Sequence, residues 1–225
     1  MQTATFGQLW RNFESAGTVL DGRYDTVRWK AQEGMFAAAV IRIDREALGP
    51  AFDDFQAALT QLEIARVHPN HFLHIMLQEL GQVADEPTGR HQITKDRLEE
   101  FTDAAAASLS SASPFELKLG GVNAFRDAVI LEVHDNGVLS RIHQRLHELA
   151  AAPNFSPYAY LPHLTVAHFV GDRSSSDVVR ELRQWRSQIF GQMTVIAVDI
   201  VLIDVAETYP LFAVHRELQL FGPGR

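Results

Sequence analysis

The chain has 225 residues, of which 46% are apolar and 21% are charged, and its formal net charge is −8. These values are ordinary for a soluble globular protein with one large domain or two small ones. The acidic balance argues against an extended nucleic-acid-binding surface, which needs a basic face, but it leaves room for a small basic pocket that binds one phosphate. The sequence has no cysteine, which excludes disulfides, thiolate zinc ligands and a thiol nucleophile.

No apolar run approaches the ~20 residues that a membrane helix needs. The N-terminal stretch "MQTATFGQLWRNFESAG" lacks the basic start and the apolar core of a secretory signal. We therefore expect a cytoplasmic enzyme or binding protein without a membrane partner.

In chain order, the sequence predicts an N-terminal extension followed by alternating strands and helices. The extension covers residues 1–34 and contains one short helix near Phe6–Ser15. Strands are expected at 36–44, 71–81, 115–122, 128–135 and 160–169, and the C-terminal tail is expected to form a closing pair of strands. Amphipathic helices are expected at 44–63, 94–109, 136–151 and 174–190, with Thr94 as an N-cap. No linker rich in Gly, Ser or Pro divides residues 35–222, which predicts a single α+β or α/β unit.

Two of the expected strands share a pattern of a histidine, alternating apolar residues and a glycine. The two stretches are "LHIMLQELG" and "PHLTVAHFVG", and their histidines are His74 and His163. Each stretch has its histidine near the beginning and is followed by a predicted helix. Each half of the core therefore contains a strand with one histidine near its start. If a pseudo-two-fold relates the halves, the two histidines converge on one cleft.

The residues near the two histidines favour phosphoester chemistry. Alternate residues of a strand share a face, so His74, Met76 and Gln78 are expected to point one way, as are His163, Thr165 and Ala167 in the second half. Two imidazoles with pKa values near ~6.5 divide the roles of acid and base near neutrality. A hydroxyl beside them hydrogen-bonds a phosphate oxygen and stabilises charge in the transition state. This combination suits metal-independent attack on a phosphodiester or a cyclic phosphate.

The paired H-x-[ST]-h motifs, with an α+β frame and "FELKLGGVNAF" between them, resemble the 2H phosphoesterase superfamily, also described as the LigT-like or 2′-5′ RNA ligase family. The resemblance covers most of the chain, from about Phe36 to Leu220. It implies an α+β fold with two pseudo-symmetric lobes of mainly antiparallel sheet, flanked by helices, and a cleft between them. It also implies a reaction without metal or cofactor on 2′,3′-cyclic phosphates, 2′-5′ linkages or ADP-ribose 1″,2″-cyclic phosphate. The expected partner is a nucleotide or a short RNA end that carries a cyclic phosphate.

Carried over residue by residue, the resemblance assigns His74 and His163 as the acid–base pair and Thr165 as the hydroxyl that orients the phosphate. Met76 stands where the first motif has Thr or Ser, and a thioether donates no hydrogen bond. His168 stands where many relatives carry Arg, and a histidine is charged only part of the time near neutrality. Both differences weaken phosphate binding. They motivate an alternative function, in which the protein binds a nucleotide or another phosphorylated ligand without turning it over.

Further residues near the motifs have two interpretations each. Gln78 either supplies an amide to the cleft or is a solvated strand residue. Tyr160 and Tyr158 either stack on a base at the rim of the cleft or anchor a loop. Gly120 and Gly121 lack the spacing of a phosphate-binding loop and predict a bulge or bend in a strand instead.

The other histidines raise the question of a metal site. His68, His71 and His74 are three residues apart, and three imidazoles can bind zinc, which would make the protein a metal-dependent hydrolase. His71 and His74 are expected to point to opposite faces of a strand, and no carboxylate lies among them, so zinc is the weaker alternative. His143 and His147 lack the Glu of the H-E-x-x-H pattern and are expected on the solvated face of a helix.

Overall fold

The computed structural model describes residues 5–23, 34–89, 91–150 and 160–222, and its main strands form two five-stranded sheets. The first sheet has the order β12-β11-β2-β4-β5 and contains β2 (Met35–Arg42), β4 (His74–Val83), β5 (Gln92–Ile93), β11 (Ala197–Asp204) and β12 (Ala213–Gln219). The second sheet has the order β10-β6-β7-β8-β3 and contains β3 (Ala65–Val67), β6 (Phe115–Ala124), β7 (Ala128–His134), β8 (His163–Phe169) and β10 (Ile189–Val195). A short ribbon pairs β1 (Thr18–Val19) with β9 (Arg173–Ser174). The pairing is antiparallel except between β4 and β5, which confirms the predicted α+β class.

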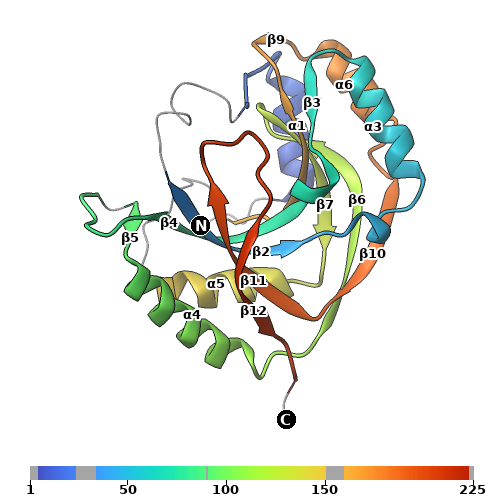
Figure 1. Ribbon diagram of the computed structural model, residues 1–225. Helices are drawn as coiled ribbons and strands as arrows, with labels where there is room; N and C mark the ends of the chain where they lie inside the picture. Colours follow the sequence, from blue (N-terminus) through green and yellow to red (C-terminus); the bar gives the residue numbers. More distant parts are fainter. Residues whose placement is uncertain (1–4, 24–33, 90, 151–159, 223–225) are drawn as a thin grey trace.

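Helices flank both sheets (Figure 1). They are α1 (Phe6–Ser15), α3 (Ala51–Gln61), α4 (Lys95–Leu109), α5 (Val138–Ala150) and α6 (Ser176–Arg183), with short 3-10 turns η1 (Arg45–Ala47) and η2 (Asn70–Phe72). Helices α4 and α5 contact each other, and α5 also packs on β4. The Thr94 side chain accepts a hydrogen bond from the Arg97 amide, which confirms Thr94 as the N-cap of α4. No helix in the described ranges is long and apolar enough to cross a membrane.

Two predicted elements near the C-terminus are wrong. The helix expected at 174–190 ends at Arg183, because the carbonyls of Trp185 and Gln188 accept hydrogen bonds from the β6 backbone and draw the segment to the sheet edge. The tail contains three strands rather than two. The chain crosses between the sheets at the exposed Ile196, so β10 joins the second sheet and β11 joins the first.

The predicted bulge at the double glycine is confirmed in β6. The register with β7 shifts between Leu119 and Val122, so Gly120 and Gly121 interrupt regular pairing. Gly121 has a φ of +77°, and a Cβ atom there would lie 2.9 Å from the Glu132 carboxylate. The backbone conformation therefore favours glycine, and a Cβ atom would also displace the Glu132 carboxylate.

Both sheets contribute to one continuous hydrophobic core. Fully buried members of this core include Leu77 and Ile75 from the first sheet and Leu119 and Leu164 from the second. Strands β4 and β8, one from each sheet, contact each other. This contact brings the two histidine-bearing strands together.

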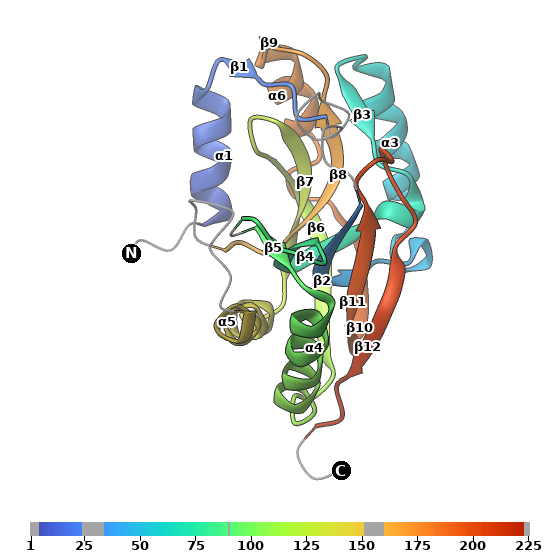
Figure 2. The same cartoon turned by 60° about the vertical axis from the view of Figure 1, so that its left-hand side comes forward.

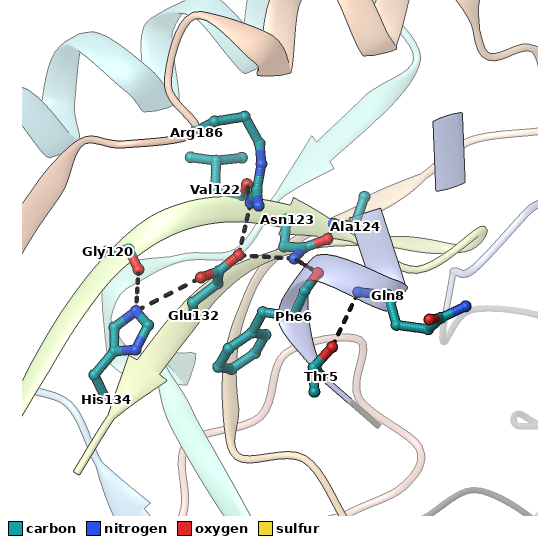
Figure 3. Close-up of polar contacts among 10 residues, drawn as sticks. All are labelled: Thr5, Phe6, Gln8, Gly120, Val122, Asn123, Ala124, Glu132, His134 and Arg186. Carbon is teal, nitrogen blue, oxygen red and sulfur yellow. Dashed lines mark hydrogen bonds and ion pairs between the residues drawn. The ribbon is translucent and has the colours of Figure 1, made fainter. Parts of the chain in front are cut away.

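Helix α1, within the predicted N-terminal extension, docks on the second sheet through a buried polar cluster (Figure 3). The Asn123 amide donates hydrogen bonds to the Phe6 carbonyl at 2.9 Å and to the Glu132 carboxylate at 2.8 Å. Arg186 pairs with Glu132 at 2.7 Å, and its guanidinium lies 4.6 Å from the centre of the Trp10 ring. Figure 2 shows α1 and α3 on opposite sides of strands β6, β7 and β8. The helix is therefore an integral part of the fold.

We predict that Asn123→Ala lowers the free energy of unfolding by about 1–3 kcal/mol, because it removes the hydrogen bond to the Phe6 carbonyl and one of the two donors to the buried Glu132 carboxylate. Urea unfolding followed by circular dichroism measures the change. Asn12→Ala, at an exposed position of α1, is the matched control and should change stability by less than about 0.5 kcal/mol. Equal effects of the two substitutions would contradict the docking role of Asn123.

Candidate active site

The two motif histidines occupy equivalent places in the two sheets. His74 is the first residue of β4 and His163 is the first residue of β8. The strands contact each other, and the rings are close enough for the charge of His163 to lower the pKa of His74. The structure thus brings together the pair that the sequence predicts.

Both histidine rings are oriented by the same hydrogen bond. His74 Nδ1 lies 2.7 Å from the carbonyl oxygen of Phe72, and His163 Nδ1 lies 2.7 Å from that of Leu161. A carbonyl oxygen only accepts, so each Nδ1 carries the proton and each neutral ring has a lone pair on Nε2. Neither Nε2 has a hydrogen-bond partner among the residues that the structure describes. Both are therefore available to a ligand.

Apolar surroundings lower the pKa of both rings. Phe72 and Phe212 contact the His74 ring with centroid distances of 5.1 and 5.0 Å, and Phe125 contacts the His163 ring at 5.0 Å. Burial lowers the pKa of His74 to about 4. Burial also lowers the pKa of His163, but the negative charge of Asp127 acts in the opposite direction. The two histidines consequently differ in how readily they take up a proton.

Thr165 lies on the same face of the second sheet as His163, which we call the site face of that sheet. Its side chain is half-buried, and its hydroxyl makes no hydrogen bond within the described ranges. After Thr165 the register shifts: Thr165 pairs with Ile130 whereas Ala167 pairs with Val129. Val166 is therefore the extra residue of a β-bulge, and the next site-face position falls on His168. The expectation that Ala167 shares the face of His163 and Thr165 is wrong, because Ala167 belongs to the main core.

The first sheet has a bulge at the equivalent place. Met76 pairs with Val40 and Gln78 pairs with Ala39, which leaves Leu77 as the extra residue. Met76 packs with Val40 in a small apolar cluster on one face, the site face of this sheet, whereas Ala39 belongs to the main core on the other face. The expectation that Gln78 shares the face of His74 and Met76 is therefore wrong. Gln78 is 5% exposed, and its amide donates to the Glu79 carbonyl at 2.7 Å.

The residue that takes the site-face position expected for Gln78 is Glu79, which sequence reasoning missed. Glu79 pairs with Ala38, a member of the site-face cluster. A strict period of two cannot find this residue, because the bulge shifts the alternation by one. A usable signal was present, since Glu79 follows His74 at the same spacing at which His168 follows His163.

Tyr160 and His143 fix the first-motif strand next to its bulge. The Tyr160 hydroxyl donates to the Met76 carbonyl at 3.0 Å, and His143 Nδ1 donates to the Leu77 carbonyl at 2.6 Å. The two rings stack with a centroid distance of 3.9 Å. The predicted solvated position of His143 is therefore wrong. Tyr160 connects the segment before His163 to the strand of His74, while Tyr158 lies outside the described residues.

The remaining histidines near the site pair with each other or with the backbone. His68 Nε2 lies 2.8 Å from His168 Nδ1, and both rings are buried. Burial lowers the pKa of His168 to about 4, so His168 contributes no positive charge to the site at neutral pH. His71 contacts the carbonyl of Tyr209. Within the part of the chain that the structure describes, His68, His71 and His74 do not form a cluster of three metal ligands.

Several solved structures share this fold at low sequence identity. The protein TT0787 of Thermus thermophilus is 16% identical, the match covers 84% of this chain and 100% of that one, and the TM-score is 0.61. E. coli LigT complexed with 3′-AMP is 16% identical, with 84% of this chain and 99% of that chain covered and a TM-score of 0.62. Among curated proteins, no significant match was found.

A family model provides the stronger result. The model described as the 2′-5′ RNA ligase superfamily matches residues 45–206, which is well over half of the chain and includes both motif histidines. The chain therefore belongs to the 2′-5′ RNA ligase superfamily, the 2H phosphoesterases.

Proposed function

We propose that the protein is a metal-independent phosphoesterase of the cyclic phosphodiesterase type, acting on a nucleotide or a short RNA end with a 2′,3′-cyclic phosphate or a 2′-5′ linkage. The observation that carries the proposal is the matched orientation of His74 and His163, whose free Nε2 atoms belong to contacting strands. No cofactor is required by this chemistry. Solved structures of E. coli LigT contain ATP, 3′-AMP and NADP+, which supports a nucleotide as the ligand.

The two histidines take different roles in the proposed hydrolysis. His74 has the lower tendency to be protonated, so its Nε2 accepts a proton from water as the water oxygen attacks phosphorus. The charge of Asp127 favours the protonated form of His163, which donates its Nε2 proton to the ribose oxygen as the phosphorus–oxygen bond breaks. The Thr165 hydroxyl donates to a non-bridging phosphate oxygen. In the ligation direction the same two groups exchange roles.

A second candidate function rests on Met76. Its side chain lies on the site face where the first motif has a hydroxyl, and it packs in the small apolar cluster. A thioether donates no hydrogen bond to a phosphate. The protein would then bind a nucleotide or another phosphorylated ligand with little turnover. Both candidates use the same site.

We predict that His74→Gln and His163→Gln each reduce kcat/KM for a 2′,3′-cyclic nucleotide by about 10²–10⁴-fold, because each removes one proton-transfer group. His91→Gln, in an exposed turn, should have no effect. Turnover followed by chromatography, with and without EDTA, measures both activity and metal dependence. Wild-type turnover in either variant would rule out the two-histidine mechanism, and a loss of activity in EDTA would favour the zinc alternative.

We predict a bell-shaped pH profile of kcat/KM with its maximum between about pH 4 and pH 6.5. On the acid side the rate rises with pH as His74 loses its proton near its pKa of about 4. On the alkaline side the rate falls as His163 loses its proton, and its pKa is lowered from the ordinary 6.5. Steady-state rates across this range, with circular dichroism as the control for folding at each pH, measure the profile. A maximum above about pH 7.5 would contradict the role assignment.

Met76→Thr distinguishes the two candidate functions. If the missing hydroxyl limits turnover, we expect the substitution to raise kcat by roughly tenfold, as one transition-state hydrogen bond permits. Met193→Thr, in β10 of the other sheet, is the matched control for the loss of a methionine. If calorimetry shows that wild type and Met76→Thr both bind a 2′,3′-cyclic nucleotide but neither releases product, the ligand-binding function is supported and the phosphoesterase function is refuted.

A further inference from the structure

Glu79 is a carboxylate on the site face of the first sheet with no assigned task. It follows Met76 as the next residue on that face, because the bulge at Leu77 turns Gln78 toward the core. The side chain is half-buried, and it forms no hydrogen bond or ion pair within the described part of the chain. Burial raises its pKa. The Gln78 amide contacts the backbone carbonyl of Glu79, not its carboxylate.

Such a carboxylate lowers the stability of the folded protein. Partial removal from water disfavours the charged form, and no protein donor compensates for it in the described structure. A ligand that donates a hydrogen bond to this carboxylate would offset that cost. The corresponding residue of the second sheet, His168, differs in this respect because His68 lies 2.8 Å from its ring.

The position of Glu79 suits the nucleoside part of a ligand. With one bulge residue between them, Glu79 lies about four strand positions from His74, which is roughly 13 Å along β4. A phosphate held at the two histidine Nε2 atoms would place the attached sugar and base within reach of such a position. A carboxylate there accepts hydrogen bonds from hydroxyl, imino or amino groups and repels phosphate oxygens.

We infer that Glu79 determines specificity: its carboxylate accepts a hydrogen bond from the ribose or base of a bound nucleotide and disfavours nucleotides with a second phosphate at that end. The inference rests on the proposed function, because it takes the phosphate position from His74 and His163. It assigns to the protein a preference for nucleoside 2′,3′-cyclic phosphates over the same compounds carrying a 5′-phosphate.

The test compares Glu79→Gln with wild type on adenosine 2′,3′-cyclic phosphate and on its 5′-phosphorylated form. Glutamine keeps the size and one acceptor oxygen but removes the charge. We expect the ratio of kcat/KM for the second substrate to that for the first to rise at least about tenfold, since repulsion of a phosphate is relieved. Glu79→Ala should also relieve the repulsion but lose the hydrogen bond, which weakens use of the first substrate. Glu217→Gln, exposed on β12 of the same sheet, should change neither rate.

Calorimetry with adenosine 3′-phosphate and adenosine 3′,5′-bisphosphate gives the same comparison without turnover. If wild type binds neither compound and hydrolyses neither substrate, the proposed function fails, and the inference fails with it. If wild type binds the two adenosine phosphates or hydrolyses the two substrates, the proposed function is retained. If Glu79→Gln then leaves the ratio of the two dissociation constants and the ratio of the two kcat/KM values unchanged, only the role of Glu79 is refuted. A folded variant, shown by an unchanged thermal transition, is required for either conclusion.

Discussion

The hydrogen bond from each histidine Nδ1 to a carbonyl of its own chain, two residues earlier, is the constraint on which the site depends. The bond is local, so the segment that leads into each strand sets the ring orientation without help from a distant residue. It fixes the proton on one nitrogen and leaves the other nitrogen for a ligand. Burial beside the surrounding phenylalanines lowers the pKa of both rings, and the charge of Asp127 opposes this effect at His163.

The rest of the site follows from how the two strands continue after the histidines. Each strand makes two regular steps and then a bulge, at Leu77 in one half and at Val166 in the other. The bulge leaves backbone groups outside the regular ladder. In the first half His143 compensates by bonding the Leu77 carbonyl, and Tyr160 bonds the neighbouring one. The bulge is thus supported by side chains from α5 and from the entry to the second motif.

Much of this arrangement could be predicted from the sequence. The repeated histidine pattern identified the two strands that contact each other, and alternation placed Thr165 correctly relative to His163. Alternation fails at Gln78 and at Ala167, because a bulge is decided by the pairing strand and its hydrogen bonds, which the local pattern does not contain. The same is true of His143, whose position on α5 looks solvated until β4 and Tyr160 are packed beside it.

The helix expected at 174–190 is longer than the observed helix α6 for a related reason. Its apolar spacing continues to Ile189, but the carbonyls of Trp185 and Gln188 find partners on β6. Tertiary hydrogen bonds ended a helix that local spacing alone would extend. In contrast, the N-terminal helix Phe6–Ser15 was correctly located, although its docking cluster of Asn123 and Glu132 could not be foreseen from residues so far along the chain.

The order of the strands also bears on how the chain folds as it is synthesised. In the first sheet β2 lies between β4 and β11, so an early strand remains half-paired until the C-terminal part of the chain has emerged. Helix α1 likewise cannot dock until Asn123 has been synthesised, because Asn123 lies 117 residues after Phe6. Neither sheet is assembled from one contiguous half of the sequence, because β3 joins the second sheet and β11 and β12 join the first. The molecule should therefore acquire its structure late and cooperatively, at the slow rates that pairing between distant segments imposes.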